Sequence, residues 1–190
     1  CPEMSELMVD IETLGTTPDA SIVSIGAVAF DADGLGEELH ISVSRASCRE
    51  HGRRVDDETL AWWQEQPQEA RHVLHGGRTL PTALAELTRF VHETGADELW
   101  GNSPAFDAVI LESAFRACES EPPWEYYQWR DVRTLRKCSP TWPDNLDREG
   151  TAHDALDDAR HQARGVQRAL NRLDRLEVIV HDDGGADNAV

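Results

Sequence analysis

Two carboxylates interrupt an apolar segment near the start of the chain. Residues 7–12 read Leu-Met-Val-Asp-Ile-Glu, a run that predicts a buried strand. Side chains at positions i and i+2 of a strand point to the same face, so Asp10 and Glu12 lie together on one side of the sheet. Buried like charges repel each other unless something neutralises them. The pair therefore predicts one half of a divalent-metal site.

A third acid, Asp107, is predicted at an end of the same sheet. Residues 98–101 read as a short strand, Ser103 as the N-cap of the next helix and Pro104 as its first residue. The helix is expected to run to about Cys118. Sites in α/β sheets gather where strands end, which places Asp107 to face one. Taken alone, an acid here is also explained by the helix dipole.

A fourth acid and a histidine belong to the segment HDALDD, which starts at His153. A helix is expected from Asp154 to Leu173. Its apolar stripe consists of Ala155, Ala159, Ala163, Val166, Leu170 and Leu173. At about 100° per residue, Asp158 lies beside this stripe, whereas Asp157 points to solvent. Asp158 is therefore the predicted inward acid, and His153 lies in the loop that precedes the helix.

The combined set is Asp10, Glu12, Asp107, Asp158 and His153. Four carboxylates without a thiolate favour a hard ion that prefers oxygen ligands, Mg²⁺ or Mn²⁺. Two such ions about 3.5–4 Å apart can stabilise the attacking and the leaving oxygen of a phosphodiester. A neutral histidine can take the proton of the attacking water. The set therefore predicts two-metal phosphodiester hydrolysis.

The elements expected around these residues form an α/β sheet of mixed direction, flanked by helices. Three antiparallel strands open the fold, at residues 7–12, 21–30 and 38–43, with a hairpin turn at 31–34. Strands and helices then alternate. Helices are expected at 56–66, at 80–92 and up to Cys138, and a last strand at 130–132, whereas residues 44–54 and 139–150 read as loops.

Length and composition predict one soluble domain over residues 1–176, with residues 1–6 outside its ordered part and a disordered acidic tail at 177–190. No apolar run approaches the roughly 20 residues that span a membrane, and no signal peptide is recognisable at the N-terminus. The cysteines are widely spaced, at Cys1, Cys48, Cys118 and Cys138. This spacing argues against a zinc site or disulfides and favours reduced thiols in the cytoplasm.

The net charge of −18 argues against a nucleic-acid ligand, because proteins that bind nucleic acids usually carry basic faces. Two basic clusters stand against this background. They are Arg45, Arg49, Arg53 and Arg54, and Arg130, Arg133, Arg136 and Lys137. Each either follows a phosphate backbone or is solvated surface charge. Asp131, beside the second cluster, is interpreted as a structural partner of a nearby arginine.

Adjacent tryptophans lie on the predicted helix at 56–66. Neighbouring helix positions face about 100° apart, so only one of Trp62 and Trp63 can point into the core. The other either stacks on a nucleic-acid base or contacts a partner subunit. The apolar residues around 60–75 favour a homodimer.

Three segments resemble, in order, the exonuclease motifs of the DEDDh subgroup of the DnaQ-like 3′-5′ exonuclease superfamily. They are VDIET from Val9, NSPAFD from Asn102 and HDALDD from His153. More narrowly, LAWWQEQ and RDVRTL are similar to a bacterial and phage branch that includes a mycobacterial exoribonuclease and phage exodeoxyribonucleases. The likeness covers roughly residues 7–173.

The resemblance implies an RNase H-like fold with metal ligands at Asp10, Glu12, Asp107 and Asp158 and a general base at His153. It further implies that Thr13 and Leu14 contact the terminal nucleotide, and Asn102 is a further candidate for substrate binding. The implied activity is a metal-dependent 3′-5′ exonuclease that releases nucleoside 5′-monophosphates from RNA or single-stranded DNA. Two alternatives stay open: a phosphodiesterase of dinucleotides and very short oligonucleotides, and a nucleic-acid-binding module without catalysis.

Overall fold

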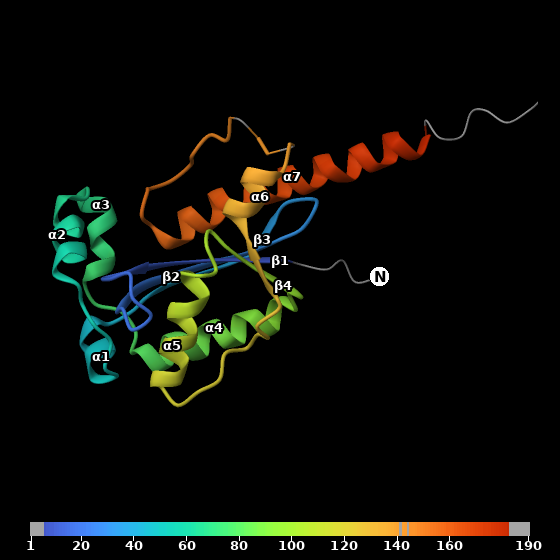
Figure 1. Ribbon diagram of the computed structural model, residues 1–190. Coiled ribbons are helices and arrows are strands. Elements are labelled where there is room, and N and C mark those ends of the chain that lie inside the picture. Colours follow the sequence, from blue (N-terminus) through green and yellow to red (C-terminus); the bar gives the residue numbers. More distant parts are fainter. Residues whose placement is uncertain (1–5, 141, 144, 183–190) are drawn as a thin grey trace, which may run out of the picture.

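A five-stranded sheet of mixed direction forms the centre of the molecule (Figure 1). The computed structural model describes residues 6–140, 142–143 and 145–182. The antiparallel strands are β1 (Glu6–Thr13), β2 (Ile22–Phe30) and β3 (Leu35–Ser42). The strands β4 (Glu98–Gly101) and β5 (Trp129–Asp131) continue the sheet in parallel from β1. The order β3-β2-β1-β4-β5 confirms the predicted α/β fold of RNase H-like type.

Helices cover both faces of the sheet (Figure 1). One face packs against α4 (Leu80–Thr94) and α5 (Asp107–Ala117), and the other against α6 (Val132–Cys138) and α7 (Ala155–Asp182). Short helices gather where β1 ends, namely α1 (Arg45–Glu50), α2 (Asp57–Glu65), α3 (Gln68–Arg71) and the 3₁₀ turn η1 (His72–Leu74). Within the described residues no helix is both long and apolar enough to cross a membrane.

The alternation of side chains along β1 decides where the acids point. Leu7, Val9 and Ile11 pack in the apolar cluster that includes α4 and α5. Met8 packs instead with the alanines of α7. Because alternate residues share a face, Asp10 and Glu12 follow Met8 onto the α7 side of the sheet. The predicted convergence of the two acids is therefore explained by the strand period.

A glycine lets α7 begin directly on the sheet. Gly26 of β2 is paired with Asp10 of β1. A Cβ atom on Gly26 would lie 2.2–2.3 Å from backbone atoms of Ala155 and Leu156, much closer than any tolerated contact. The missing side chain thus brings the first turn of α7 beside Asp10.

The structure corrects three of the expected boundaries. Residues 44–54 were expected to form a loop but contain α1, which Ser44 caps. Ser103 is not the cap of α5: its carbonyl oxygen accepts hydrogen bonds from the amides of Phe106 and Asp107 in a turn, and the helix starts at Asp107. Finally, α7 continues past Leu173 to Asp182, so the first part of the expected tail is helical. Residues 1–5 and 183–190 lie outside the described part of the chain.

Arg53 of the first basic cluster has an internal role. Its side chain is buried, and the guanidinium donates hydrogen bonds to the carbonyl oxygens of Pro18 and Ala20 and to the hydroxyl of Ser113. Arg54 pairs with Asp19 at the surface. The interpretation of this cluster as a phosphate-binding surface is therefore wrong for Arg53, because its donors are used within the protein.

We predict that Gly26→Ala displaces the first turn of α7 and lowers the free energy of unfolding by about 1–3 kcal/mol, the usual effect of overpacking. Gly34→Ala is the matched control, because a Cβ on Gly34 meets no atom within 4 Å. Urea denaturation of both variants measures the difference. A wild-type midpoint for Gly26→Ala would contradict the close contact between β2 and α7.

Candidate active site

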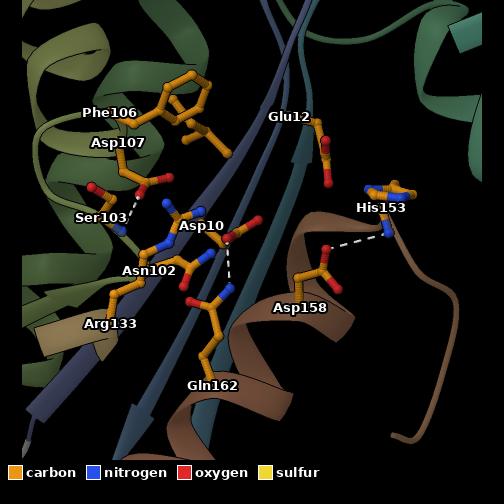
Figure 2. Close-up of a pocket in the computed structure, with 11 residues that line it drawn as sticks. Asp10, Glu12, Asn102, Ser103, Phe106, Asp107, Arg133, His153, Asp158 and Gln162 are labelled. Atoms are coloured by element: carbon orange, nitrogen blue, oxygen red, sulfur yellow. Dashed lines mark hydrogen bonds between the residues drawn. The ribbon is translucent and has the colours of Figure 1, made fainter. Parts of the chain in front are cut away.

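The five residues predicted to do the chemistry line one pocket of about 370 Å³ (Figure 2). Asp10 and Glu12 come from β1, Asp107 from the start of α5, and Asp158 from the first turns of α7. His153 lies in the loop before α7. The structure thus brings together acids from three elements that are far apart in the sequence.

Asp10 lies in the middle of this group, between Asp107 and Asp158 (Figure 2). Its side chain is buried and accepts a hydrogen bond of 2.8 Å from the amide nitrogen of Gln162. Burial, together with the neighbouring charges of Asp107 and Glu12, holds the pKa of Asp10 well above its usual range. Without a cation, Asp10 therefore carries a proton more readily than an ordinary aspartate.

The pKa values of Glu12 and Asp107 are shifted in the same direction as that of Asp10. Burial, with the charges of Asp154 and Asp107, raises the pKa of Glu12 to about 8. Burial also raises the pKa of Asp107 to about 7, although Ser103 donates its backbone N–H to this carboxylate at 3.4 Å. Gly101 leaves the necessary room, because a Cβ there would lie 3.2 Å from Oδ2 of Asp107.

His153 adopts a backbone conformation that is uncommon for a residue with a side chain, at φ 64°. Its backbone N–H donates a hydrogen bond of 3.2 Å to Asp158, and Asp158 also forms an ion pair with Arg148. Burial and the charge of Arg148 lower the pKa of His153. The imidazole is therefore neutral near pH 7 and free to accept a proton.

Asp157 holds the loop of His153, which corrects its predicted place in solvent. Its carboxylate accepts a hydrogen bond of 2.8 Å from the backbone N–H of Thr151 and one of 2.7 Å from Arg160. Gly150 lies so close that a Cβ there would be 2.3 Å from this carboxylate, and its φ of 84° also favours glycine. The helical periodicity correctly predicted that Asp157 points away from the core. It could not predict that the loop before α7 packs against this side chain.

Asp154 is a buried acid that the sequence did not single out. Its carboxylate caps α7, accepting hydrogen bonds from the backbone N–H groups of Leu156 and Asp157 at 3.1 and 3.2 Å. It also lies 3.7 Å from His40 of β3. An Asp before a run of helical residues is an ordinary capping signal, so this role was readable from the sequence.

The adjacent tryptophans divide as predicted, one inside and one partly exposed. Trp63 is 1% exposed and donates its indole N–H to the carbonyl oxygen of Thr13, at 2.9 Å. Trp62 is 40% exposed, and its ring centroid lies 4.8 Å from that of His153 in an edge-on arrangement. The contact between α2 and the histidine loop was not predicted, because the two segments are distant in the sequence.

The predicted substrate-binding residues are placed differently from one another. Asn102 lines the pocket. Thr13 and Leu14 do not: the hydroxyl of Thr13 donates to the carbonyl oxygen of Gly15 at 2.7 Å, and Leu14 is fully buried. Their contact with a terminal nucleotide stays a prediction, and the side chain of Leu14 does not support it in this conformation.

The second basic cluster also divides. Arg130 pairs with Glu98 across β5 and β4, whereas Arg133 lines the pocket. Asp131 caps α6 by accepting a hydrogen bond of 2.7 Å from the backbone N–H of Thr134. It has a structural role, as expected, but its partner is a helix end and not an arginine.

The pocket fits a divalent cation. Glu12, His153 and Asp158 each offer an oxygen or nitrogen atom, and these atoms lie within 4.8 Å of one another. Burial is the main cause of the raised pKa values of Asp10, Glu12 and Asp107, and a bound cation would favour their charged forms. Hard oxygen donors that need neutralisation are the chemistry that Mg²⁺ and Mn²⁺ satisfy.

Comparison with known proteins decides the family. The sequence model of the protein family described as the 3′-5′ exoribonuclease Rv2179c-like domain matches residues 5–170. The chain belongs to this family. Membership confirms the DnaQ-like 3′-5′ exonuclease superfamily that the motifs predicted, and it makes this Rv2179c-like domain a hydrolase of the 3′-5′ exonuclease class.

One sequence relative and two solved structures are also similar to this Rv2179c-like domain. An exodeoxyribonuclease of enterobacteria phage T4 is 22% identical over 160 residues, which are 69% of this chain and 70% of the phage protein. The zinc-bound complex of E. coli ExoI with single-stranded DNA superposes with a TM-score of 0.64 at 20% identity, over 95% of this chain and 43% of ExoI. Cell-death related nuclease 4 gives 0.66 at 16% identity, over 90% and 65%. The chain thus spans less than half the length of ExoI.

We predict that the metal-free protein loses stability as the pH rises from about 4 to about 8. In an unfolded chain Asp and Glu titrate near 4, whereas the folded pKa is about 7 for Asp107 and about 8 for Glu12. Between these values the folded state binds more protons, so its stability is greatest at the acidic end.

Mg²⁺ should therefore raise the melting temperature more near pH 8 than near pH 5, where the folded acids hold protons. Glu12→Gln should reduce the difference, and Glu37→Gln, which removes an exposed acid of β3, should leave it as it is. Thermal melts with Mg²⁺ and with EDTA measure the effect. An equal gain at both pH values would contradict the raised pKa values.

Proposed function

We propose that this domain is a metal-dependent exonuclease that removes nucleoside 5′-monophosphates from the 3′ ends of RNA or single-stranded DNA. The observation that carries the proposal is the convergence of four carboxylates and His153 on one pocket of an exonuclease fold. Mg²⁺ or Mn²⁺ would be held, as two ions, by Asp10, Glu12, Asp107 and Asp158. When bound, the ions supply positive charge that stabilises the phosphate in the transition state and lowers the pKa of water.

The residues of the chain provide the proton transfer and the orientation. His153 takes the proton of the attacking water as the new O–P bond forms. The bond from phosphorus to the 3′ oxygen of the preceding nucleotide breaks, and this oxygen leaves with the electron pair and takes a proton from solvent to become the new 3′ hydroxyl. The lowered pKa of His153 supports this role, because a neutral imidazole is required to accept the proton. Trp62 packs against the imidazole of His153, with the two rings nearly perpendicular and their centroids 4.8 Å apart.

The choice of substrate rests on two observations. The family description names an exoribonuclease, and ExoI, a structural relative, is seen in complex with single-stranded DNA. The net charge of −18 favours short strands, because a long polyanion meets repulsion beyond the pocket. Dinucleotides and very short oligonucleotides are therefore the second candidate substrates. A homodimer and a cytoplasmic location stay predictions.

A digestion panel tests the proposed function. It contains single-stranded and duplex RNA and DNA, labelled at the 3′ or the 5′ end, with Mg²⁺ or Mn²⁺. We expect a 3′ label to appear at once as a mononucleotide and a 5′-labelled strand to shorten stepwise. Asp10→Ala and Asp158→Ala should abolish both while the fold is kept, and Asp33→Asn, in the exposed turn after β2, should not. Full activity of either alanine variant, or no metal-dependent release from any substrate, would overturn the proposal.

We predict that His153→Ala slows turnover by roughly 10²- to 10⁴-fold, the usual contribution of a general base. The affinity for Mn²⁺ should fall only modestly, because the carboxylates supply most of the ligands. Single-turnover rates and Mn²⁺ titration separate the two quantities, and His92→Ala on the exposed side of α4 is the control. Normal turnover at saturating Mn²⁺ combined with a collapse of Mn²⁺ affinity would make His153 a ligand and not the base.

A further inference from the structure

A second pocket, of about 350 Å³, adjoins the carboxylate pocket. The two pockets lie side by side, because both are lined by Asn102, Arg133, Asp158 and Gln162. The second pocket extends between α6, the segment before α7, and α7 itself. The charged residues that line the first pocket are mainly acids, whereas those that line the second are mainly basic. Arg136, Arg148 and His161 line the second pocket together with Arg133.

The cations of this second pocket face the acids of the first. Burial raises the pKa values of Asp107, Asp10 and Glu12, and the charge of Arg133 partly offsets this for Asp107, as that of Arg148 does for Asp10 and Glu12. Arg148 also forms the ion pair with Asp158. Although the chain has a net charge of −18, Arg133, Arg136 and Arg148 therefore lie together on one side of the carboxylate pocket.

Two further observations indicate a place for a ligand. Nδ1 of His161 and Oε1 of Gln162 are buried and have no hydrogen-bond partner among the described residues, although buried polar atoms are normally paired. The ring of Trp142 lines the second pocket and packs against α7 at Gly165, where a Cβ would lie 2.7 Å from the ring. Arginines beside an aromatic ring are the usual composition of a groove for single-stranded nucleic acid.

We propose that this second pocket binds the phosphate and nucleoside that precede the scissile bond. The proposal rests on the proposed function and adds the direction of the strand. The nucleotide that is released carries only the scissile phosphate, which lies at the carboxylates. Further phosphates exist only on the strand that remains, so the side of the site with Arg133, Arg136 and Arg148 is the strand side. Guanidinium groups suit this role because they bind phosphate oxygens in pairs.

Arg136→Met is the informative variant, since Arg136 lines the second pocket but not the first. Two substrates are compared: a short single-stranded oligonucleotide, and the p-nitrophenyl ester of thymidine 5′-monophosphate. The ester has a scissile phosphate but no preceding nucleotide. Arg116→Met, on the exposed side of α5 and away from both pockets, is the matched control for the change in charge.

We expect Arg136→Met to raise KM for the oligonucleotide about tenfold, the effect of losing one charged hydrogen bond, with kcat nearly kept. The ratio of kcat/KM for oligonucleotide over ester should fall accordingly, and the slope of log KM against log salt should decrease by about 0.7. Arg116→Met should change neither. An unchanged ratio and salt slope in Arg136→Met, with wild-type protein active on both substrates, would overturn the inference and leave the proposed function standing. Inactive wild-type protein on both substrates would instead overturn the proposed function.

Discussion

The burial of like-charged carboxylates around one pocket beside β1 is the constraint on which the rest of this structure depends. Asp10 and Asp107 are almost fully buried, and Glu12 lies beside them with a pKa raised to about 8. Such burial opposes folding unless apolar packing elsewhere offsets it. Here the opposite face of β1 provides that packing, through Leu7, Val9 and Ile11 against α4 and α5. One strand therefore carries the core on one side and the reactive acids on the other.

The histidine loop is held from outside the pocket. His153 has a positive φ, which is unfavourable for most residues, and such a conformation persists only where the surroundings enforce it. Three contacts hold the loop. The backbone N–H of Thr151 donates a hydrogen bond to Asp157, the carboxylate of Asp154 caps α7, and the ring of Trp62 packs against that of His153. None of these groups needs to touch a phosphate. They keep the imidazole of His153 near Asp158, so the proposed general base is in position before a substrate binds.

Local periodicity was enough to predict from the sequence where three of the four acids point. The period of two along β1 placed Asp10 and Glu12 together, and the helical phase separated Asp158 from Asp157. The predictions that failed were those that depended on contacts between segments far apart in the sequence. The burial of Arg53 requires carbonyl groups from the turn after β1 and from α5, and the seat of α7 requires Gly26 on β2. No pattern within a short window contains that information, because it exists only once the sheet and its helices have come together.

The net charge of −18 is likewise a poor guide to what the site can bind. Electrostatic interactions between exposed charges are screened beyond about 8–10 Å at physiological salt, so a bound phosphate responds to its immediate neighbours. Several arginines are already matched, Arg54 by Asp19, Arg130 by Glu98 and Arg160 by Glu38. Around the second pocket, Arg148 pairs with Asp158 of the carboxylate pocket, and Arg133 lines both pockets. A phosphate that bridges both pockets would meet guanidinium groups on one side, and the carboxylates with any cation that they hold on the other. The excess of acidic residues on the rest of the surface repels only a strand that is long enough to extend beyond the two pockets. The proposed preference for short strands therefore follows from the same charge distribution that permits phosphate binding.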